Sequence, residues 1–154
     1  SVLKAIENSE AIEVRYQSMS NSDPVWRWIA PHALGFDGFR WHARAWCLKD
    51  EVFKDFVLSR MLKERGRKPS KIDLQADLDW HRKVKLEVVP HPALSEAQRA
   101  AIALDYGMTN GSASLSVRGA MLYYTLRRLG LDTDPGARKP QDQQIVLVRQ
   151  EMTA

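Results

Sequence analysis

The sequence predicts a mainly β first half that closes into a small barrel, followed by a compact α+β second half. Short stretches of alternating apolar and polar residues follow one another over residues 11–62. Strand and helix patterns then alternate over residues 83–154. Between these parts, residues 63–82 are rich in charged and turn-forming residues, which predicts a basic linker.

Four stretches of the first half are predicted to be strands. Residues 11–17 (AIEVRYQ) alternate apolar and polar side chains, which is the pattern of a half-buried strand. Residues 25–36 follow a turn-rich loop, and Pro31 within them indicates a bend or an edge position. Residues 38–47 and 52–61 continue the series. Consecutive short strands favour a small barrel, because closure of the sheet removes its exposed edges.

Asp37 and Gly38 predict a tight connection between the second and third strands. Asp followed by Gly is typical of a two-residue type I′ hairpin turn. In that register Phe36 faces Phe39 on the apolar side of the hairpin. We therefore expect both rings to point toward the core.

The third strand has a polar face. Because successive side chains of a strand point to opposite sides, Arg40, His42 and Arg44 share one face. The opposite face is apolar and consists of Phe39, Trp41, Ala43 and Ala45. Two interpretations remain open at this point. The polar line is either the floor of an anion or nucleotide pocket, or a row of cations paired with carboxylates of neighbouring strands.

The second half predicts a strand–helix–strand–helix–strand unit. A strand at 84–89 is ended by prolines, and a helix over 95–107 has a serine N-cap and a terminal glycine. A short strand at 114–117 leads into a helix over 118–130 that has apolar residues on one face. Residues 143–150 form the last predicted strand.

Composition limits the classes of protein to consider. The formal net charge is +4, and much of the excess lies in KERGRKPSK at residues 63–71. Such a run is either a solvated linker or a contact for nucleic acid or phosphate. The single cysteine, Cys47, excludes an internal disulfide framework, and no apolar run is long enough to cross a bilayer. We expect a cytoplasmic protein without a membrane partner.

The sequence lacks the common motifs of catalysis and metal binding. It has no glycine-rich phosphate loop, no His-Glu-x-x-His and no Cys-x-x-Cys. Cys47 and His42 lie five residues apart on one strand, which places them on opposite faces and disfavours a nucleophile pair. We therefore expect no enzyme activity, no metal site and no cofactor.

Three stretches carry a resemblance to a known family: IEVRYQS at 12–18, FRWHARAWC at 39–47 and FVLSRM at 56–61. With them the chain resembles the WYL-domain transcriptional regulators of bacteria. The name-giving tripeptide reads Trp-His-Ala here and departs from the family at two of three letters. The stretches PHPALSEAQRAAIALDYGM and YYTLRRLGL extend the resemblance to the BrxR/CapW-like subset, which consists of repressors linked to phage-defence loci.

The resemblance implies a division of the chain. Residues 11–62 are expected to form a small Sm-like, SH3-type β-barrel, the WYL domain. Residues 83–154 are expected to form a compact α+β dimerisation domain of the WCX type. Residues 1–10 would then be a linker from a missing N-terminal winged helix-turn-helix module, and residues 63–82 the basic linker.

The resemblance also implies a ligand pocket formed by Tyr16, Ser18, His42, Arg44 and Arg60. Guanidinium groups suit phosphate or carboxylate, and the tyrosine ring offers a platform for a base. The residues alone leave another interpretation open. The two arginines pair with Asp55 or Glu13 on neighbouring strands, and Tyr16 belongs to the core with only its hydroxyl on a polar partner.

The expected function follows from the resemblance. The chain would be the ligand-sensing and dimerising portion of a homodimeric repressor of a phage-defence locus. Its effector would be a small anionic, nucleotide-like molecule or a short nucleic-acid strand, and operator DNA would bind through the missing winged helix-turn-helix. A stand-alone module that binds RNA or single-stranded nucleic acid is the alternative.

Overall fold

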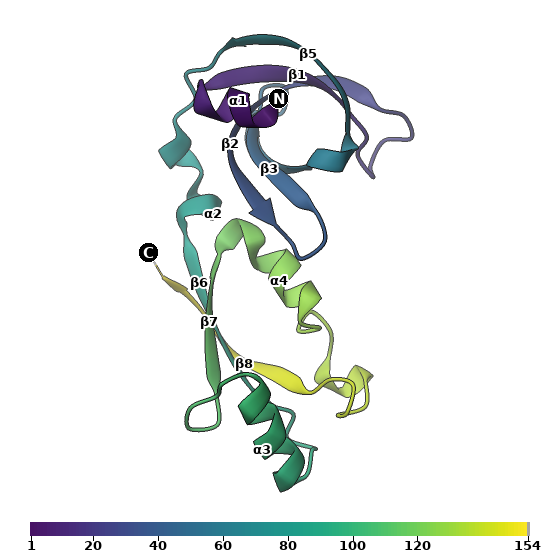
Figure 1. Ribbon diagram of the computed structural model, residues 1–154, viewed down its shortest axis with the longest axis vertical. Coiled ribbons are helices and arrows are strands. Elements are labelled where there is room, and N and C mark those ends of the chain that lie inside the picture. Colours follow the sequence, from purple (N-terminus) through teal and green to yellow (C-terminus); the bar gives the residue numbers. More distant parts are fainter. Residues whose placement is uncertain (154) are drawn as a thin grey trace. The chain divides into compact units, whose positions relative to one another are not determined.

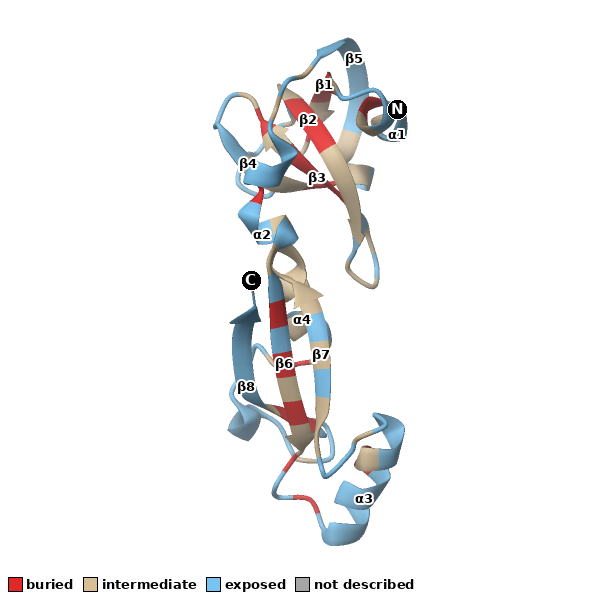
Figure 2. Ribbon diagram, turned by 90° about the vertical axis from the view of Figure 1, so that its left-hand side faces the viewer, coloured by how far each residue is buried: buried red, intermediate tan, exposed pale blue. Residues whose placement is uncertain are grey.

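The computed structural model describes residues 1–153 and divides the chain into two units, Ser1–Asp77 and Leu78–Ala154. The first unit is mainly β and the second is α+β, as the sequence predicts (Figure 1). Each unit buries a hydrophobic cluster of its own. Figure 2 shows buried residues on β1, β2 and β3 in the first unit and on β6 in the second.

The first unit is a five-stranded antiparallel sheet in the order β4-β3-β2-β1-β5, and it curls around a common centre (Figure 1). Its elements are α1 (Val2–Glu7), β1 (Glu10–Tyr16), β2 (Val25–Phe36), β3 (Trp41–Cys47), β4 (Val52–Val57), η1 (Leu58–Arg60), β5 (Met61–Pro69) and η2 (Leu74–Ala76). The 3-10 turn η1 carries the chain from β4 at one edge to β5 at the other.

The core of the barrel comes from α1 and from inward-facing residues of β1, β2, β3 and β4. The buried cluster is made of Ala5, Ile12, Val14, Tyr16, Ile29, Ala45, Cys47 and Phe56. Ala45 and Cys47 point inward from β3, so strand alternation places His42 and Arg44 on its other face. The pairing of β2 with β3 shifts register between Pro31 and Ala33, so the ladder is interrupted next to the proline.

The predicted turn at Asp37 and Gly38 is wrong by one residue. Phe36 pairs with Trp41, and the backbone N–H of Asp37 donates to the Arg40 carbonyl at 3.1 Å, so the turn lies at Gly38 and Phe39. The Asp37 side chain stabilises this turn, since its Oδ1 accepts the backbone N–H of Phe39 at 2.8 Å and of Arg40 at 2.7 Å. In this register Phe39 is 90% exposed and Trp41 is 52% exposed, and neither ring belongs to the core.

Two expected linkers prove to be structured. Residues 63–69, placed in the basic linker by the sequence, belong to β5 (Met61–Pro69), which pairs with β1 from Glu10–Pro69 to Tyr16–Met61. Every residue of β5 after Met61 is exposed, so this edge strand lacks the apolar alternation by which strands are recognised. Residues 1–10, also expected to be a linker, contain α1, which contributes Ala5 to the core.

The second unit is a three-stranded antiparallel sheet in the order β7-β6-β8 together with two main helices. Its elements are α2 (Leu78–His81), β6 (Lys83–Pro90), α3 (Glu96–Asp105), β7 (Ala113–Arg118), η3 (Gly119–Met121), α4 (Leu122–Arg128), η4 (Pro135–Ala137) and β8 (Ile145–Thr153). Ser95 caps α3 in a capping box with Gln98, which confirms the predicted helix start. Val88, Leu94 and Ile102 are central to its core.

Helix α2 is anchored within the second unit by Arg118 of β7. The Nη1 of Arg118 donates to the backbone carbonyl of Trp80 at 2.8 Å. Its guanidinium also lies 4.5 Å from the centre of the Trp80 ring, a cation–π contact. The backbone N–H of Gly119 donates to the carbonyl of Arg82 at 2.9 Å. The chain is therefore attached to the second unit from Trp80 onward.

Candidate functional site

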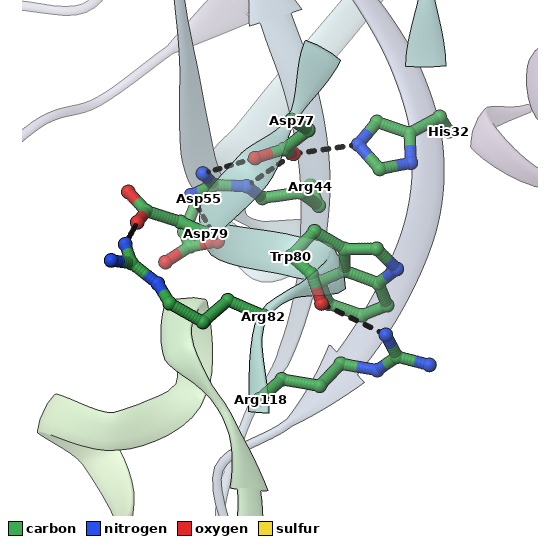
Figure 3. Close-up of polar contacts among 8 residues, drawn as sticks. All are labelled: His32, Arg44, Asp55, Asp77, Asp79, Trp80, Arg82 and Arg118. Carbon is green, nitrogen blue, oxygen red and sulfur yellow. Dashed lines mark hydrogen bonds and ion pairs between the residues drawn. The ribbon is translucent and has the colours of Figure 1, made fainter. Parts of the chain in front are cut away.

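A buried charge cluster of the first unit centres on Arg44 of β3, which is 7% exposed (Figure 3). Its Nε donates to Oδ2 of Asp77 at 2.7 Å, and its Nη2 donates to Oδ1 at 2.8 Å. This is a bidentate pair, the geometry in which a guanidinium holds carboxylate or phosphate. Its Nη1 lies 3.4 Å from Oδ1 of Asp55, the residue that faces Arg44 across the β3–β4 ladder.

The pairing with Asp55 confirms the second sequence interpretation for Arg44. Asp77 was missed by sequence reasoning, because it lies 33 residues away and comes from the segment that follows the barrel. Burial alone would lower the pKa of the Arg44 guanidinium, but the bonds to Asp77 and the nearby charge of Asp55 raise it above its ordinary value. Arg44 is therefore a fixed cation that the protein itself neutralises.

His32 of β2 completes this cluster. Its Nε2 lies 2.8 Å from the same Asp77 oxygen that accepts the Arg44 Nε bond. The ring packs edge-on against Phe53 with centroids 5.6 Å apart, and Phe53 in turn packs against Trp46. His32 lies inside strand β2, where it helps to hold a buried carboxylate.

His42 is fully buried and faces a second internal carboxylate. Its Nε2 lies 2.7 Å from Oδ2 of Asp37, and the Nε of Arg40 donates to the same oxygen at 3.1 Å. Burial alone would raise the pKa of Asp37. The hydrogen bonds from His42 and from the backbone N–H of Arg40 and Phe39 outweigh burial and hold this pKa well below its usual range.

Tyr16 belongs to the barrel core, as the second sequence interpretation allows. It packs edge-on against Phe56 with ring centroids 5.1 Å apart, and its hydroxyl accepts the backbone N–H of Val57 at 2.9 Å. The Arg27 guanidinium lies 5.7 Å from the centre of the Tyr16 ring. This cation–π contact places Arg27 beside one of the expected pocket residues.

Ser18 and Arg60 lie near Tyr16. The Ser18 hydroxyl accepts the backbone N–H of Asn21 at 3.2 Å, in the loop before β2. The backbone carbonyl of Arg60 accepts the N–H of Gln17 at 3.1 Å, which brings the end of η1 to the end of β1. None of the ion pairs found within residues 1–153 involves the Arg60 guanidinium. Its expected pairing with Asp55 or Glu13 is not seen, and Glu13 binds Arg65 instead.

The five expected pocket residues therefore fall into two groups. Tyr16, Ser18 and Arg60 meet where β1 ends, and His42 and Arg44 lie on the outward face of β3. His42 is linked to the first group through Val57, which pairs with it in the β3–β4 ladder and donates to Tyr16. The pocket assignment of all five stays a prediction.

Within residues 1–153, no three His, Cys, Asp or Glu side chains gather in a way that could hold a metal ion. In the same range, no helix combines the length and apolar character needed to cross a membrane.

Comparisons with known proteins agree with the two-unit division. Residues 1–65 match the WYL domain, and residues 83–152 match the BrxR transcriptional regulator C-terminal dimerization domain. The chain is 42% identical over 151 residues to the DNA-binding transcriptional repressor CapW of Stenotrophomonas maltophilia, covering 97% of this chain and 50% of that protein. It is 38% identical over 148 residues to CapW of Pseudomonas aeruginosa, covering 95% of this chain and 49% of that protein.

A solved structure of proteasome accessory factor B/C of Arthrobacter aurescens aligns with 96% of this chain and 23% of its own, at 17% identity and a TM-score of 0.41. The chain spans about half the length of the curated relatives it matches. Taken with the two domain matches, these relatives place the chain among the WYL-domain proteins that carry a BrxR-type C-terminal dimerization domain.

Proposed function

We propose that the chain is the ligand-sensing and dimerising portion of a homodimeric transcriptional repressor that acts on a phage-defence locus. The observation that carries this proposal is the presence of a WYL domain and a BrxR-type dimerization domain in one chain. Relatives that cover nearly all of it are named DNA-binding transcriptional repressors. In this proposal, operator DNA binds to a winged helix-turn-helix module that precedes these two domains.

The proposed effector is a small anionic molecule of the nucleotide class, bound by the barrel near Arg60 and Arg44. The absence of an ion pair at Arg60 among residues 1–153 supports this choice, because a half-buried guanidinium is a strong donor for phosphate. Arg44 already holds the Asp77 carboxylate by a bidentate contact, so an anion would have to displace Asp77 to reach this guanidinium.

Control of repression would follow from a shift between two arrangements of the dimer. An effector changes that balance only if it binds one arrangement more tightly than the other. Dimerisation through the second unit suits this scheme, because a twofold protein matches a palindromic operator. No catalytic step is part of the proposal.

A stand-alone module that binds RNA or single-stranded nucleic acid remains the second candidate. Strand β5 favours it, because this exposed edge carries Lys63, Arg65, Arg67 and Lys68. Such binding would weaken steeply with added salt and would grow with strand length. The sensor instead predicts saturation at one ligand per barrel and no dependence on strand length.

Native mass spectrometry of the chain, with inorganic pyrophosphate and 5′-AMP as probes, tests the proposal. We expect a dimer that takes up one anion per protomer, and we expect Arg60→Ala to remove that adduct without dissociating the dimer. Lys63→Ala is the matched control, since it removes a nearby exposed cation from β5. A monomer, or binding that both substitutions weaken equally, would contradict the proposal. Hydrolysis of a nucleotide would reveal an enzyme instead.

A further inference from the structure

We infer that the Asp77 side chain occupies the Arg44 site in the absence of a ligand. An anionic effector would then act by displacing Asp77 and releasing the segment that joins the two units, residues 71–79. This inference rests on the proposed function and deepens it, because it names how the site is regulated. The carboxylate of Asp77 holds Arg44 by the same two-pronged contact that a phosphate would make, at 2.7 and 2.8 Å. The ligand and the chain's own side chain therefore compete for one guanidinium.

Burial along the segment identifies Asp77 as its anchor. From Lys71 to Asp79, all of which the structure describes, Asp77 is the one buried residue, at 1% exposure. The turn η2 just before it is held by local bonds, since Ala76 donates to the Asp73 carbonyl and Asp77 to the Leu74 carbonyl. The side chain of Asp77 carries the bonds that reach β2 and β3.

The packing beneath this segment is incomplete. A cavity of about 110 Å³ is lined by residues of α1, β1 and β2 on one side and of the segment on the other, including His32, Ile72 and Leu74. Leu74 is 41% exposed, whereas Asp77 is 1% exposed. Because the buried contact of this segment is a carboxylate on a guanidinium, a competing anion can weaken it, whereas an apolar anchor would not respond to charge.

The position of Asp77 in the chain links this release to the dimerization domain. Asp77 is the last residue of the first unit and Leu78 is the first of the second. Trp80, three residues later, is attached within the second unit by Arg118 (Figure 3). Opening the Arg44–Asp77 pair therefore releases the residues that directly precede the second unit.

Hydrogen exchange with and without inorganic pyrophosphate tests the inference on the whole chain. The amides of Ala76 and Asp77 report the segment, because both donate within it. We expect Asp77→Asn to speed their exchange at least tenfold and to bind pyrophosphate at least tenfold more tightly than the wild type. In the wild type, pyrophosphate itself should speed exchange at the same two amides.

Asp79→Asn is the matched control. It makes the same charge change two residues along, at an exposed side chain that binds Arg82. It should leave both exchange and pyrophosphate affinity at wild-type values. Unchanged exchange in Asp77→Asn, or equal effects of the two substitutions, would overturn the inference.

The outcomes separate this inference from the proposed function. Pyrophosphate that binds neither the wild type nor Asp77→Asn refutes the anion pocket and the inference with it. Pyrophosphate that binds both with equal strength refutes the inference alone. If Asp77→Asn does not fold, the double variant Arg44→Met/Asp77→Leu tests the inference, because its apolar pair keeps the segment attached without charge. Hydrogen exchange at the amides of residues 76 and 77 should stay slow in this variant and should not respond to pyrophosphate. Acceleration by pyrophosphate would contradict the inference.

Discussion

Arg44 and Asp77 form a bidentate ion pair in which both partners are buried, with Nε to Oδ2 at 2.7 Å and Nη2 to Oδ1 at 2.8 Å. One partner lies in the middle of the barrel sheet and the other is the last residue of the first unit. The pair therefore combines two roles in one contact. It neutralises the cation on which an anion pocket would depend, and it attaches the last residue of the first unit to the barrel sheet.

Removing one partner of this pair should lower the free energy of unfolding far more than replacing both partners. Arg44→Ala leaves Asp77 and Asp55 without their shared cation, and we expect the free energy of unfolding of the first unit to fall by about 3–5 kcal/mol. Arg44→Met/Asp77→Leu should recover most of that loss, because well-packed apolar side chains replace buried ion pairs at little cost. Urea unfolding followed by tryptophan fluorescence measures both variants, since every tryptophan except Trp80 lies in the first unit.

A double variant as unstable as Arg44→Ala would show that the apolar pair cannot fill this site. Arg65→Ala serves as the surface comparison. It breaks the pair between Arg65 and Glu13, in which the Arg65 side chain is 57% exposed. If Arg65→Ala lowered the free energy of unfolding as much as Arg44→Ala, burial would not explain the importance of the Arg44–Asp77 pair.

The strands of the barrel could be predicted because their interior side chains are apolar at every second position. That pattern is present in β1, where Ile12 and Val14 alternate with polar residues. It is missing from β5, because this strand lies exposed at the edge of the sheet and does not alternate apolar and polar residues. Secondary structure that depends on backbone pairing alone is therefore invisible to an argument from periodicity.

The polar face of β3 was predicted, but its partners were not. Alternation along the strand correctly placed His42 and Arg44 together, and cross-strand pairing identified Asp55. Asp77 lies 33 residues from Arg44, and Asp37 meets His42 because the hairpin turn lies one residue later than predicted and its N–H groups bind the Asp37 side chain. Both contacts depend on tertiary geometry, which neither residue spacing nor propensity records.

Acid should weaken the fold through Asp37. Because its folded pKa is lowered, the stability that Asp37 contributes is fully present above the unfolded carboxyl value of about 3.9 and is lost as the pH falls toward the folded pKa. We expect the stability difference between wild type and Asp37→Asn to shrink steadily below about pH 4. Urea midpoints measured between pH 6 and pH 2 give this difference. A constant difference over that range would show that the Asp37 carboxylate does not favour its charged form in the fold.

Tyr16→Phe should separate the two contacts of this residue. The ring stays in the core beside Phe56, but the buried N–H of Val57 loses its acceptor, and we expect a loss of about 1–3 kcal/mol. Tyr123→Phe is the control, because this hydroxyl is on an exposed side chain and accepts from Arg127. Thermal unfolding of both variants tests the difference. A stability unchanged by Tyr16→Phe would mean that water replaces the lost acceptor.

Arg60→Ala should separate ligand binding from folding. No ion pair within residues 1–153 uses this guanidinium, so we expect the free energy of unfolding to change by no more than about 0.5 kcal/mol. One charge-assisted hydrogen bond is worth about 1.5–3 kcal/mol, so loss of this donor should weaken pyrophosphate binding by at least about tenfold. Isothermal titration at fixed salt concentration measures the affinity, and Lys63→Ala reports the effect of removing a nearby cation that is not part of the pocket. An affinity that Arg60→Ala leaves unchanged would place the anion elsewhere on the barrel, and one that Lys63→Ala lowers equally would assign the binding to general surface charge.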